Sequence, residues 1–196
     1  MGAGKAEGLL LILSAPSGCG KTTIVDRLLK RHPDWAPSIS VTTRVPRQGE
    51  KNGVDYFFVS ARDFEAMASK SELLESAKVF GHFYGTPKRS VMEALDQGKK
   101  VILAIDTQGT KQVKKILDKK VPLASIFVLP PSVKILRERL EGRHTESPAE
   151  IQRRIEVAQD EIKAAAWYDF TVVNQNLEQT VSEIEQFVEK FQKERK

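Results

Sequence analysis

The chain has 196 residues, of which 40% are hydrophobic and 29% charged, and its formal net charge is +5. This length suits one globular domain, with room for a small mobile subdomain, and the composition excludes a disordered or fibrous protein. The positive charge suits an anionic partner such as a nucleotide, a phosphate or a nucleic acid, without choosing among them. The single cysteine, Cys19, excludes an intramolecular disulfide. We therefore expect a protein of the reducing cytoplasm.

Apolar runs typical of β-strands alternate along the chain with amphipathic runs typical of helices. This alternation predicts an α/β fold with a central, mostly parallel sheet. The predicted strands lie at about residues 9–13, 39–43, 56–59, 101–105, 125–129 and 170–173. The predicted helices follow Lys21, Ala61, Pro87, Asp106, Pro131 and Pro148, and a last helix runs from Leu177 toward the C-terminus. Helical spacing gives this last helix an apolar face for the core, made of Val181, Ile184, Phe187, Val188 and Phe191.

Two regions interrupt the alternation. Residues 35–90 hold several short strand candidates between helices, as an inserted subdomain would, and residues 137–154 are dense in charge. We therefore expect a single domain over residues 1–196, with a core of residues 1–36, 88–136 and 155–196. A small α+β subdomain at about residues 37–87 and a short helical lid at about residues 137–154 complete this prediction.

The strongest motif lies between the first predicted strand and the first predicted helix. It reads Ala15-Pro16-Ser17-Gly18-Cys19-Gly20-Lys21-Thr22. This context is the one that a phosphate-binding P-loop requires, because glycines let backbone N–H groups converge on phosphate oxygens at a helix N-terminus. Lys21 would reach the β- and γ-phosphates of a nucleoside triphosphate, and Thr22 would place its hydroxyl on Mg²⁺.

Two residues of this loop need separate expectations. Ala15 stands where the strict pattern has its first glycine. Alanine tolerates most turns except a strongly left-handed one, so we expect little damage. Cys19 is interpreted as a small filler of the loop and not as a nucleophile, because no histidine or second cysteine pairs with it in the sequence.

A second anion site is predicted after the second strand. The chain reads Ser40-Val41-Thr42-Thr43-Arg44-Val45-Pro46-Arg47-Gln48-Gly49-Glu50, and Gly53-Val54-Asp55-Tyr56 follows. Two arginines three residues apart, Arg44 and Arg47, with Pro46 stiffening the segment between them, can clamp a second phosphate.

Together with the P-loop, this segment resembles the guanylate kinase family, and later motifs continue the resemblance. They are Glu75, then Gly81-His82-Phe83-Tyr84-Gly85-Thr86, Ile105-Asp106-Thr107-Gln108-Gly109 and Arg139-Leu140-Glu141-Gly142-Arg143-His144-Thr145. The matches follow the family order from about residue 9 to residue 177, which is nearly the whole chain.

The resemblance implies an enzyme of purine nucleotide metabolism that uses ATP and Mg²⁺ to phosphorylate GMP, and dGMP as well, yielding GDP or dGDP. It implies a P-loop kinase fold in which the inserted subdomain binds GMP and the lid closes over ATP. The substrates ATP and GMP are then the partners, without nucleic acid or membrane. The sequence leaves open whether the chain is a monomer or a homo-oligomer.

The resemblance also implies roles for individual residues. The ATP phosphates would be bound by Ala15, Pro16, Ser17, Gly18, Cys19, Gly20, Lys21, Thr22 and Thr23, with Mg²⁺ on Thr22. The GMP phosphate would be held by Arg44, Arg47, Tyr56 and Tyr84, and guanine would contact Ser40, Glu75, Thr86 and Asp106. Catalysis would rest on Lys21, Arg44, Arg139, Arg143 and Arg154.

The guanine contacts also make chemical sense. Guanine has donors at N1 and N2 and an acceptor at O6, so a carboxylate such as Glu75 can accept from the base and a hydroxyl can donate to it. Adenine has no N1 hydrogen and would leave the carboxylate unpaired. Sites that read a polar group in this way discriminate by about 10⁴ or more.

The chain departs from the family pattern at a few positions. Ala104 stands where many relatives have an acid, His144 replaces a frequent glycine of the lid, and Gln175 and Asn176 replace acids. We expect these departures to tune the rate or the lid motion without abolishing activity.

Other functions stay open at this stage. The first is a catalytically silent guanylate-kinase-like interaction module, although such modules usually have a degraded P-loop and here Lys21 and Thr22 are present. The second is a P-loop kinase for another phosphorylated acceptor, such as AMP, a pyrimidine nucleotide or a phosphorylated sugar. A nucleic-acid binder would fit the charge, but the chain carries no recognisable reading motif.

Overall fold

The computed structural model describes residues 7–117, 120–142 and 147–195. Within them the chain divides into two compact units, each assembled from separate stretches of sequence. Of the described residues, unit 1 comprises 7–10, 34–103, 108–117 and 120–123, and unit 2 comprises 11–33, 104–107, 124–142 and 147–195. The predicted division into a core, a subdomain and a lid stays a prediction.

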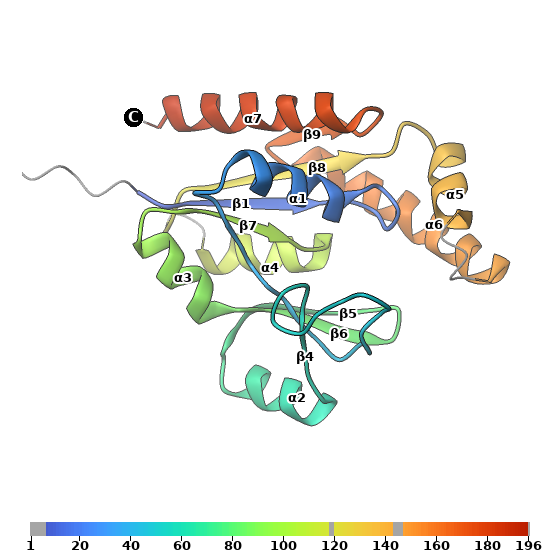
Figure 1. Ribbon diagram of the computed structural model, residues 1–196, viewed down its shortest axis with the longest axis horizontal. Helices are drawn as coiled ribbons and strands as arrows, with labels where there is room; N and C mark the ends of the chain where they lie inside the picture. Colours follow the sequence, from blue (N-terminus) through green and yellow to red (C-terminus); the bar gives the residue numbers. More distant parts are fainter. Residues whose placement is uncertain (1–6, 118–119, 143–146, 196) are drawn as a thin grey trace, which may run out of the picture. The chain divides into compact units, whose positions relative to one another are not determined.

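The described residues form two β-sheets with helices around them (Figure 1). The larger sheet has the strand order β2 (Ala36–Pro37), β7 (Lys100–Ala104), β1 (Leu9–Ser14), β8 (Leu123–Leu129) and β9 (Phe170–Val173). The pairs β2–β7 and β8–β9 are parallel. All six residues of β1 are buried, as expected for a strand covered on both faces of a parallel sheet. The predicted α/β class is therefore confirmed.

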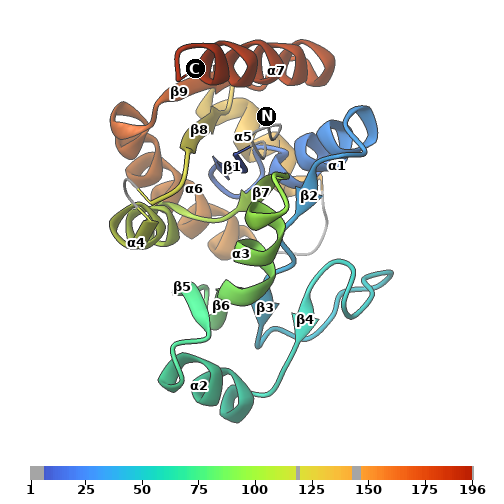
Figure 2. The same ribbon diagram turned by 90° about the vertical axis from the view of Figure 1, so that its left-hand side faces the viewer.

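Unit 1 holds the smaller sheet, in the order β4 (Phe57–Phe58), β3 (Val41–Thr42), β6 (His82–Pro87) and β5 (Leu73–Val79). Helix α2 (Ala61–Ser69) contacts β5 (Figure 2). The buried ring of Phe64 stacks on Phe83 with centroids 5.4 Å apart. Unit 1 also contains α3 (Lys88–Asp96) and all of α4 (Thr107–Leu117) except its first residue.

The hairpin of β5 and β6 was not among the strands predicted by residue range. Two residues connect it, Phe80 and Gly81, and both have positive φ, of 47° and 87°. Such a turn matches the twist of the paired strands, but its usual sequence signal is Asn-Gly or Asp-Gly. A phenylalanine at positive φ is uncommon, so this turn carries no clear signal in the sequence.

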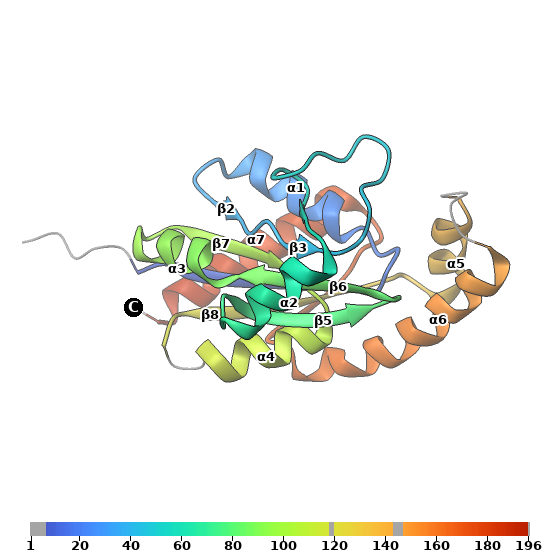
Figure 3. The ribbon, with the colours of Figure 1, turned by 90° about the horizontal axis from the view of Figure 1, so that it is seen from below.

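Unit 2 contains α1 (Lys21–Arg31), α5 (Val133–Glu141), α6 (Pro148–Lys163), a 3₁₀ turn (Ala164–Trp167) and α7 (Leu177–Lys193). Helices α5 and α6 pack against each other (Figure 3). Helix α6 begins with Pro148 at its first turn, as predicted, and a capping box between Ser147 and Glu150 closes this end of the helix. Pro131, in contrast, lies before the N-cap Ser132, so α5 starts at Val133. None of the described helices combines the length and the apolar character needed to cross a membrane.

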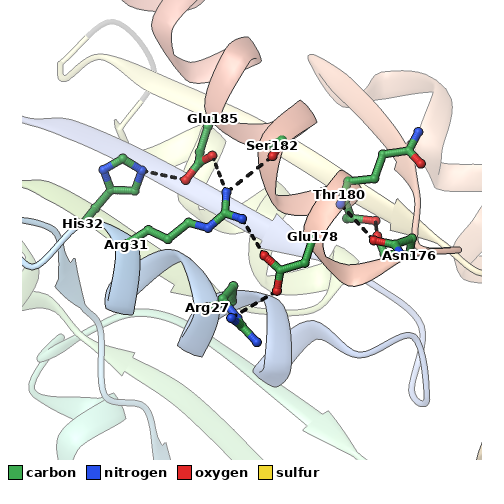
Figure 4. A network of polar contacts seen from close by, with 9 residues as sticks. Arg27, Arg31, His32, Asn176, Glu178, Thr180, Ser182 and Glu185 are labelled. Carbon is green, nitrogen blue, oxygen red and sulfur yellow. Dashed lines mark hydrogen bonds and ion pairs between the residues drawn. The ribbon is translucent and has the colours of Figure 1, made fainter.

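Helix α7 packs on β9 and α1 through the face that the spacing predicts. Val181, Ile184 and Val188 are fully buried, whereas Phe187 stays partly exposed and stacks on Phe170 with centroids 4.7 Å apart. Charged side chains also connect α1 with α7 (Figure 4), where Arg31 of α1 binds both Glu178 and Glu185 of α7. Because these ion pairs are half exposed, buried apolar side chains supply most of the stabilisation of this helix pair.

Asn176, one of the positions at which the chain departs from the family pattern, has a structural role at the start of α7. The side chain of Asn176 is the N-cap, and its Oδ1 accepts a hydrogen bond from the backbone N–H of Gln179 at 3.1 Å. Asparagine and aspartate cap helices about equally well, so an amide can replace the acid here without loss.

We predict that Asn176→Ala lowers the free energy of unfolding by about 1 kcal/mol, because it removes this cap. Asn176→Asp is the matched control and should keep nearly all of the stability. Urea denaturation of the three proteins measures the difference, and an equal loss in both variants would show that the cap is not the cause.

Candidate active site

The P-loop lies in unit 2 and connects β1 to α1. Gly18 has φ of 94°, and Gly20, the N-cap of α1, has φ of 83° in the left-handed region. A Cβ atom at Gly18 would lie 2.9 Å from Leu136 Cδ1, and one at Gly20 would lie 2.7 Å from Asn174 Nδ2. Both positions therefore require glycine, which leaves the backbone at the N-terminus of α1 open to an anion.

The structure agrees with the expectations for Ala15 and Cys19. Ala15 is buried. Among the described residues, the non-glycine residues with positive φ are Ser71 and Phe80, so Ala15 has negative φ. Alanine is therefore unstrained in place of the first glycine, as predicted. Cys19 is fully buried, and its backbone N–H donates to the carbonyl of Pro16 at 3.1 Å. This position agrees with a filler role for its side chain.

The residues that follow the loop present a cation and hydroxyls on the first turn of α1. Lys21 Nζ donates to the carbonyl oxygen of Ile105 at 3.1 Å. The side chains of Thr22 and Thr23 are exposed. A hydroxyl at this place suits Mg²⁺, a hard cation that keeps several waters and binds mainly through substrate phosphates.

Of the predicted catalytic arginines, one contacts the P-loop and another contacts Asn174, a residue that binds the loop backbone. Arg154 of α6 donates to Ser17 Oγ at 2.8 Å, and Arg139 of α5 donates to the backbone carbonyl of Asn174 at 2.9 Å. Asn174 in turn donates from Nδ2 to the carbonyl of Cys19 at 2.8 Å. The structure thus places Arg139 and Arg154 around the loop, while Arg143 and His144 lie outside the described residues. The sequence motifs gave Asn174 no role.

Asp106 and Glu161 add negative charge near Lys21. Burial raises the pKa of Glu161, on α6, while the charge of Lys21 opposes the shift and that of Asp106 adds to it, and the resulting pKa is about 7. No sequence motif points to Glu161, because it reaches this place only through the packing of α6. A carboxyl group with a pKa near neutral pH close to the P-loop lysine is a candidate functional group.

The position of Glu161 predicts a pH dependence of stability in the ligand-free protein. Its pKa is higher in the folded chain than the ordinary value of 4.5, so the folded state binds the proton more tightly. The contribution of Glu161 is fully present below pH 4.5 and is lost as the pH rises through about 7.

Glu161→Gln should therefore flatten the fall in unfolding free energy between these pH values. Urea denaturation over this range measures the effect, and Glu156→Gln, which changes an exposed carboxyl of the same helix, is the control. A wild-type pH profile for Glu161→Gln would contradict the assignment.

In unit 1 the structure brings Arg44, Tyr56 and Tyr84 together. The guanidinium carbon of Arg44 lies 5.4 Å from the centroid of the Tyr56 ring, and the Tyr56 and Tyr84 rings meet edge to face at 6.1 Å. Burial also raises the pKa of the Tyr56 hydroxyl. These three side chains are predicted to hold the phosphate of the acceptor.

Glu50 belongs to the same group, although the sequence motifs gave it no role. Both of its carboxylate oxygens accept from Arg44 Nη2 at 2.9 Å. Burial lowers the pKa of Arg44, but hydrogen bonds with Glu50 and Tyr84 outweigh this and hold it above its usual value. Burial likewise favours the neutral form of Glu50, yet its bonds with Arg44 keep its pKa below the usual range. The pair is therefore ionised and fixes the guanidinium over the aromatic ring.

Arg47 takes a different place from Arg44. Its side chain is exposed, and its backbone N–H donates to Glu50 Oε2 at 2.7 Å. Ser40 is half buried, and its carbonyl accepts from the backbone of Phe57 at 2.9 Å. The predicted roles of both side chains stay predictions.

The predicted base-reading residues Glu75 and Thr86 form a buried pair. Glu75 is 5% exposed and Thr86 is 0% exposed, and the Thr86 hydroxyl donates to Glu75 Oε1 at 2.7 Å. The other oxygen, Oε2, lies so close to Gly109 that a Cβ atom there would be 2.6 Å from it. Asp106, the fourth predicted guanine contact, belongs to unit 2.

The chain was compared with known proteins. The sequence model of the family named Guanylate kinase matches residues 7–191. A guanylate kinase of Clostridioides difficile (strain 630) is 47% identical over 91% of this chain and 86% of its own length. One from Wolbachia sp. subsp. Brugia malayi (strain TRS) is 44% identical over 94% of this chain and 93% of its own. The crystal structure of guanylate kinase from Anaplasma phagocytophilum superposes with a TM-score of 0.79 at 34% identity, covering 94% of this chain and 86% of that one.

A buried strand, a glycine loop and a lysine at the start of a helix define a P-loop phosphotransferase, and two arginines attach to the loop or its support. The chain belongs to the guanylate kinase family. Enzymes of this family are nucleoside monophosphate kinases, and the rival interpretation of a silent interaction module is not favoured.

Proposed function

We propose that this enzyme transfers the γ-phosphoryl group of ATP to GMP, with dGMP as a second acceptor, and that it needs Mg²⁺. The observation that carries the proposal is the buried carboxylate of Glu75, which accepts from Thr86 and lies in the same unit as the Arg44, Tyr56 and Tyr84 group. One unit thus offers both a base-reading carboxylate and a phosphate-binding cation.

Glu75 and Thr86 supply selectivity for guanine. The Glu75 carboxylate accepts from the donors at N1 and N2 of guanine. Adenine presents an acceptor at N1 and would leave this buried carboxylate without a donor from the base. An unpaired buried charge is costly, so the base contact discriminates strongly. Ser40 and Asp106 complete the proposed guanine contacts.

Arg44 supplies the main charge for the acceptor phosphate, with Tyr56, Tyr84 and Arg47 as further donors. Glu50 holds the Arg44 guanidinium over the Tyr56 ring before any substrate binds. The cation is thus positioned in advance, which lowers the entropic cost of binding GMP.

The ATP phosphates are assigned to residues 15–23, where Lys21 neutralises charge on the β- and γ-phosphates. Thr22 is the residue that would hold Mg²⁺, which when bound neutralises charge on the same phosphates. Arg139, Arg143 and Arg154 gather around the transferring group and exclude water from it. We assign the lid to residues 137–154 and the GMP-binding subdomain to residues 37–87.

In the reaction, a phosphate oxygen of GMP attacks the γ-phosphorus of ATP, and the bond from that phosphorus to the bridging oxygen breaks. ADP leaves with this oxygen, and GDP is formed. The attacking oxygen is already anionic, so the site needs positioned cations more than a strong general base.

Lys21→Met should lower kcat for GMP by orders of magnitude, because it removes a cation that stabilises charge in the transition state. Lys30→Met, at an exposed position of the same helix, is the control and should keep wild-type turnover. Coupled ADP-release assays measure both variants, with the melting temperature as a check on folding. Wild-type turnover in Lys21→Met would contradict the P-loop assignment.

The acceptor assignment is tested with ATP, Mg²⁺ and one acceptor at a time: GMP, dGMP, AMP, UMP or CMP. We expect turnover with GMP and dGMP far above the others, and we expect Glu75→Gln to lose much of this preference while KM for ATP stays unchanged. A preference for another acceptor, or an unchanged preference in Glu75→Gln, would remove Glu75 from the base site.

A further inference from the structure

The edge strand of the smaller sheet is tied to a helix beside Glu75. Strand β5 lies at the end of the sheet order, so one side of its backbone has no neighbouring strand among the described residues. Gln112 of α4 occupies that side: its Oε1 accepts from the N–H of Ser76 at 3.1 Å, and its Nε2 donates to the carbonyl of Ser76 at 2.8 Å. One side-chain amide thus pairs with both polar groups of the residue that follows Glu75, as a neighbouring strand would.

The backbone on the other side of Glu75 is also irregular. Leu73 pairs with Pro87 and Glu75 with Thr86, so β5 has one more residue than β6 in this interval and forms a bulge at Leu74. A bulge redirects the side chains that follow it. Glu75 therefore has a bulge immediately before it and the Gln112 contact immediately after it.

The same helix also contacts the carboxylate itself. Gly109 and Gln112 are three residues apart on α4 and share one face of the helix. Gly109 is the residue that leaves space for Glu75 Oε2, which would lie 2.6 Å from a Cβ atom at that position. One face of α4 therefore restricts the position of the Glu75 carboxylate at Gly109 and holds the adjoining backbone of Ser76 through Gln112.

We propose that Gln112 is a positioning residue for guanine recognition, which fixes the Glu75 carboxylate by holding the backbone of Ser76 against α4. Gln112 does not touch the base and acts through Glu75. The inference rests on the proposed function, because it gives Glu75 the guanine contact argued above.

The surroundings of Gln112 allow this role to be separated from a role in folding. Gln112 is half buried and lines a surface hollow of about 270 Å³ together with Glu75, Ser76 and Ile116. Water entering from this hollow can pair with Ser76 when the amide is removed, so the variant avoids a buried unsatisfied backbone. Strand β5 then keeps its hydrogen bonds to β6 but loses its fixed position on α4.

The test compares Gln112→Leu, which keeps the size but removes the amide, with the control Lys115→Ala at an exposed position of the same helix. Both are assayed with GMP and with IMP, which has the N1 hydrogen of guanine but lacks the N2 amino group. We expect kcat/KM for GMP to fall on the order of tenfold or more in Gln112→Leu, mainly through KM. The preference for GMP over IMP should narrow, KM for ATP should stay unchanged, and hydrogen exchange at the Ser76 amide should accelerate.

A folded Gln112→Leu protein with faster exchange at Ser76 but a wild-type KM and preference for GMP would overturn the inference. Equal losses with GMP, IMP and ATP would overturn it as well, because they indicate a general structural effect. If Gln112→Leu does not fold, Gln112→Met carries the same expectation. Glu75→Gln in the same assay separates the two proposals: if its preference for GMP is unchanged, the proposed base site fails, and if only the Gln112 variants are unchanged, the positioning role alone fails.

Discussion

The proposed acceptor site depends on one constraint, the burial of an ionisable carboxyl group, that of Glu75, in unit 1. A carboxylate taken out of water is costly unless hydrogen-bond donors replace its hydration. The Thr86 hydroxyl donates to one oxygen of Glu75, and Gly109 lets the first turn of α4 approach the other. The N-terminus of a helix carries partial positive charge, which favours an anion at that place. The bulge at Leu74 and the amide of Gln112 then fix the strand from which this carboxylate extends.

The cations proposed to bind the substrate phosphates are held by internal partners in the ligand-free protein. Arg44 binds Glu50, Lys21 binds the carbonyl of Ile105, and Arg154 binds Ser17. These contacts satisfy donors that would otherwise lie poorly solvated in the site, and they place each donor before a substrate arrives. Carbonyl and hydroxyl oxygens bind a cation more weakly than a phosphate does, so in the proposed function a bound triphosphate would replace these two contacts of Lys21 and Arg154.

The sequence predicted the parts of the fold that depend on local signals. The P-loop could be found because its glycines, lysine and flanking strand and helix are contiguous. The start of α6 could be found because Pro148 lies where a helix start tolerates proline. The β5–β6 hairpin was missed because Phe80-Gly81 is an unusual turn. Glu161, Asn174 and Gln112 were missed because their roles arise from contacts with residues far away in the sequence. The guanine and phosphate residues were assigned from family motifs, and the structure brings Glu75 together with Thr86, and Arg44 with Tyr56 and Tyr84.

Carboxyl ¹³C NMR tests directly whether the Glu75 carboxylate binds the guanine base, because it observes that carboxyl group itself. The side-chain carboxyl resonance of Glu75, assigned by its loss in Glu75→Gln, should shift when GMP is added without ATP. AMP, at concentrations that saturate the proposed phosphate site around Arg44, should leave the Glu75 resonance unchanged. A resonance that does not move at saturating GMP, or that moves equally with AMP, would contradict the account.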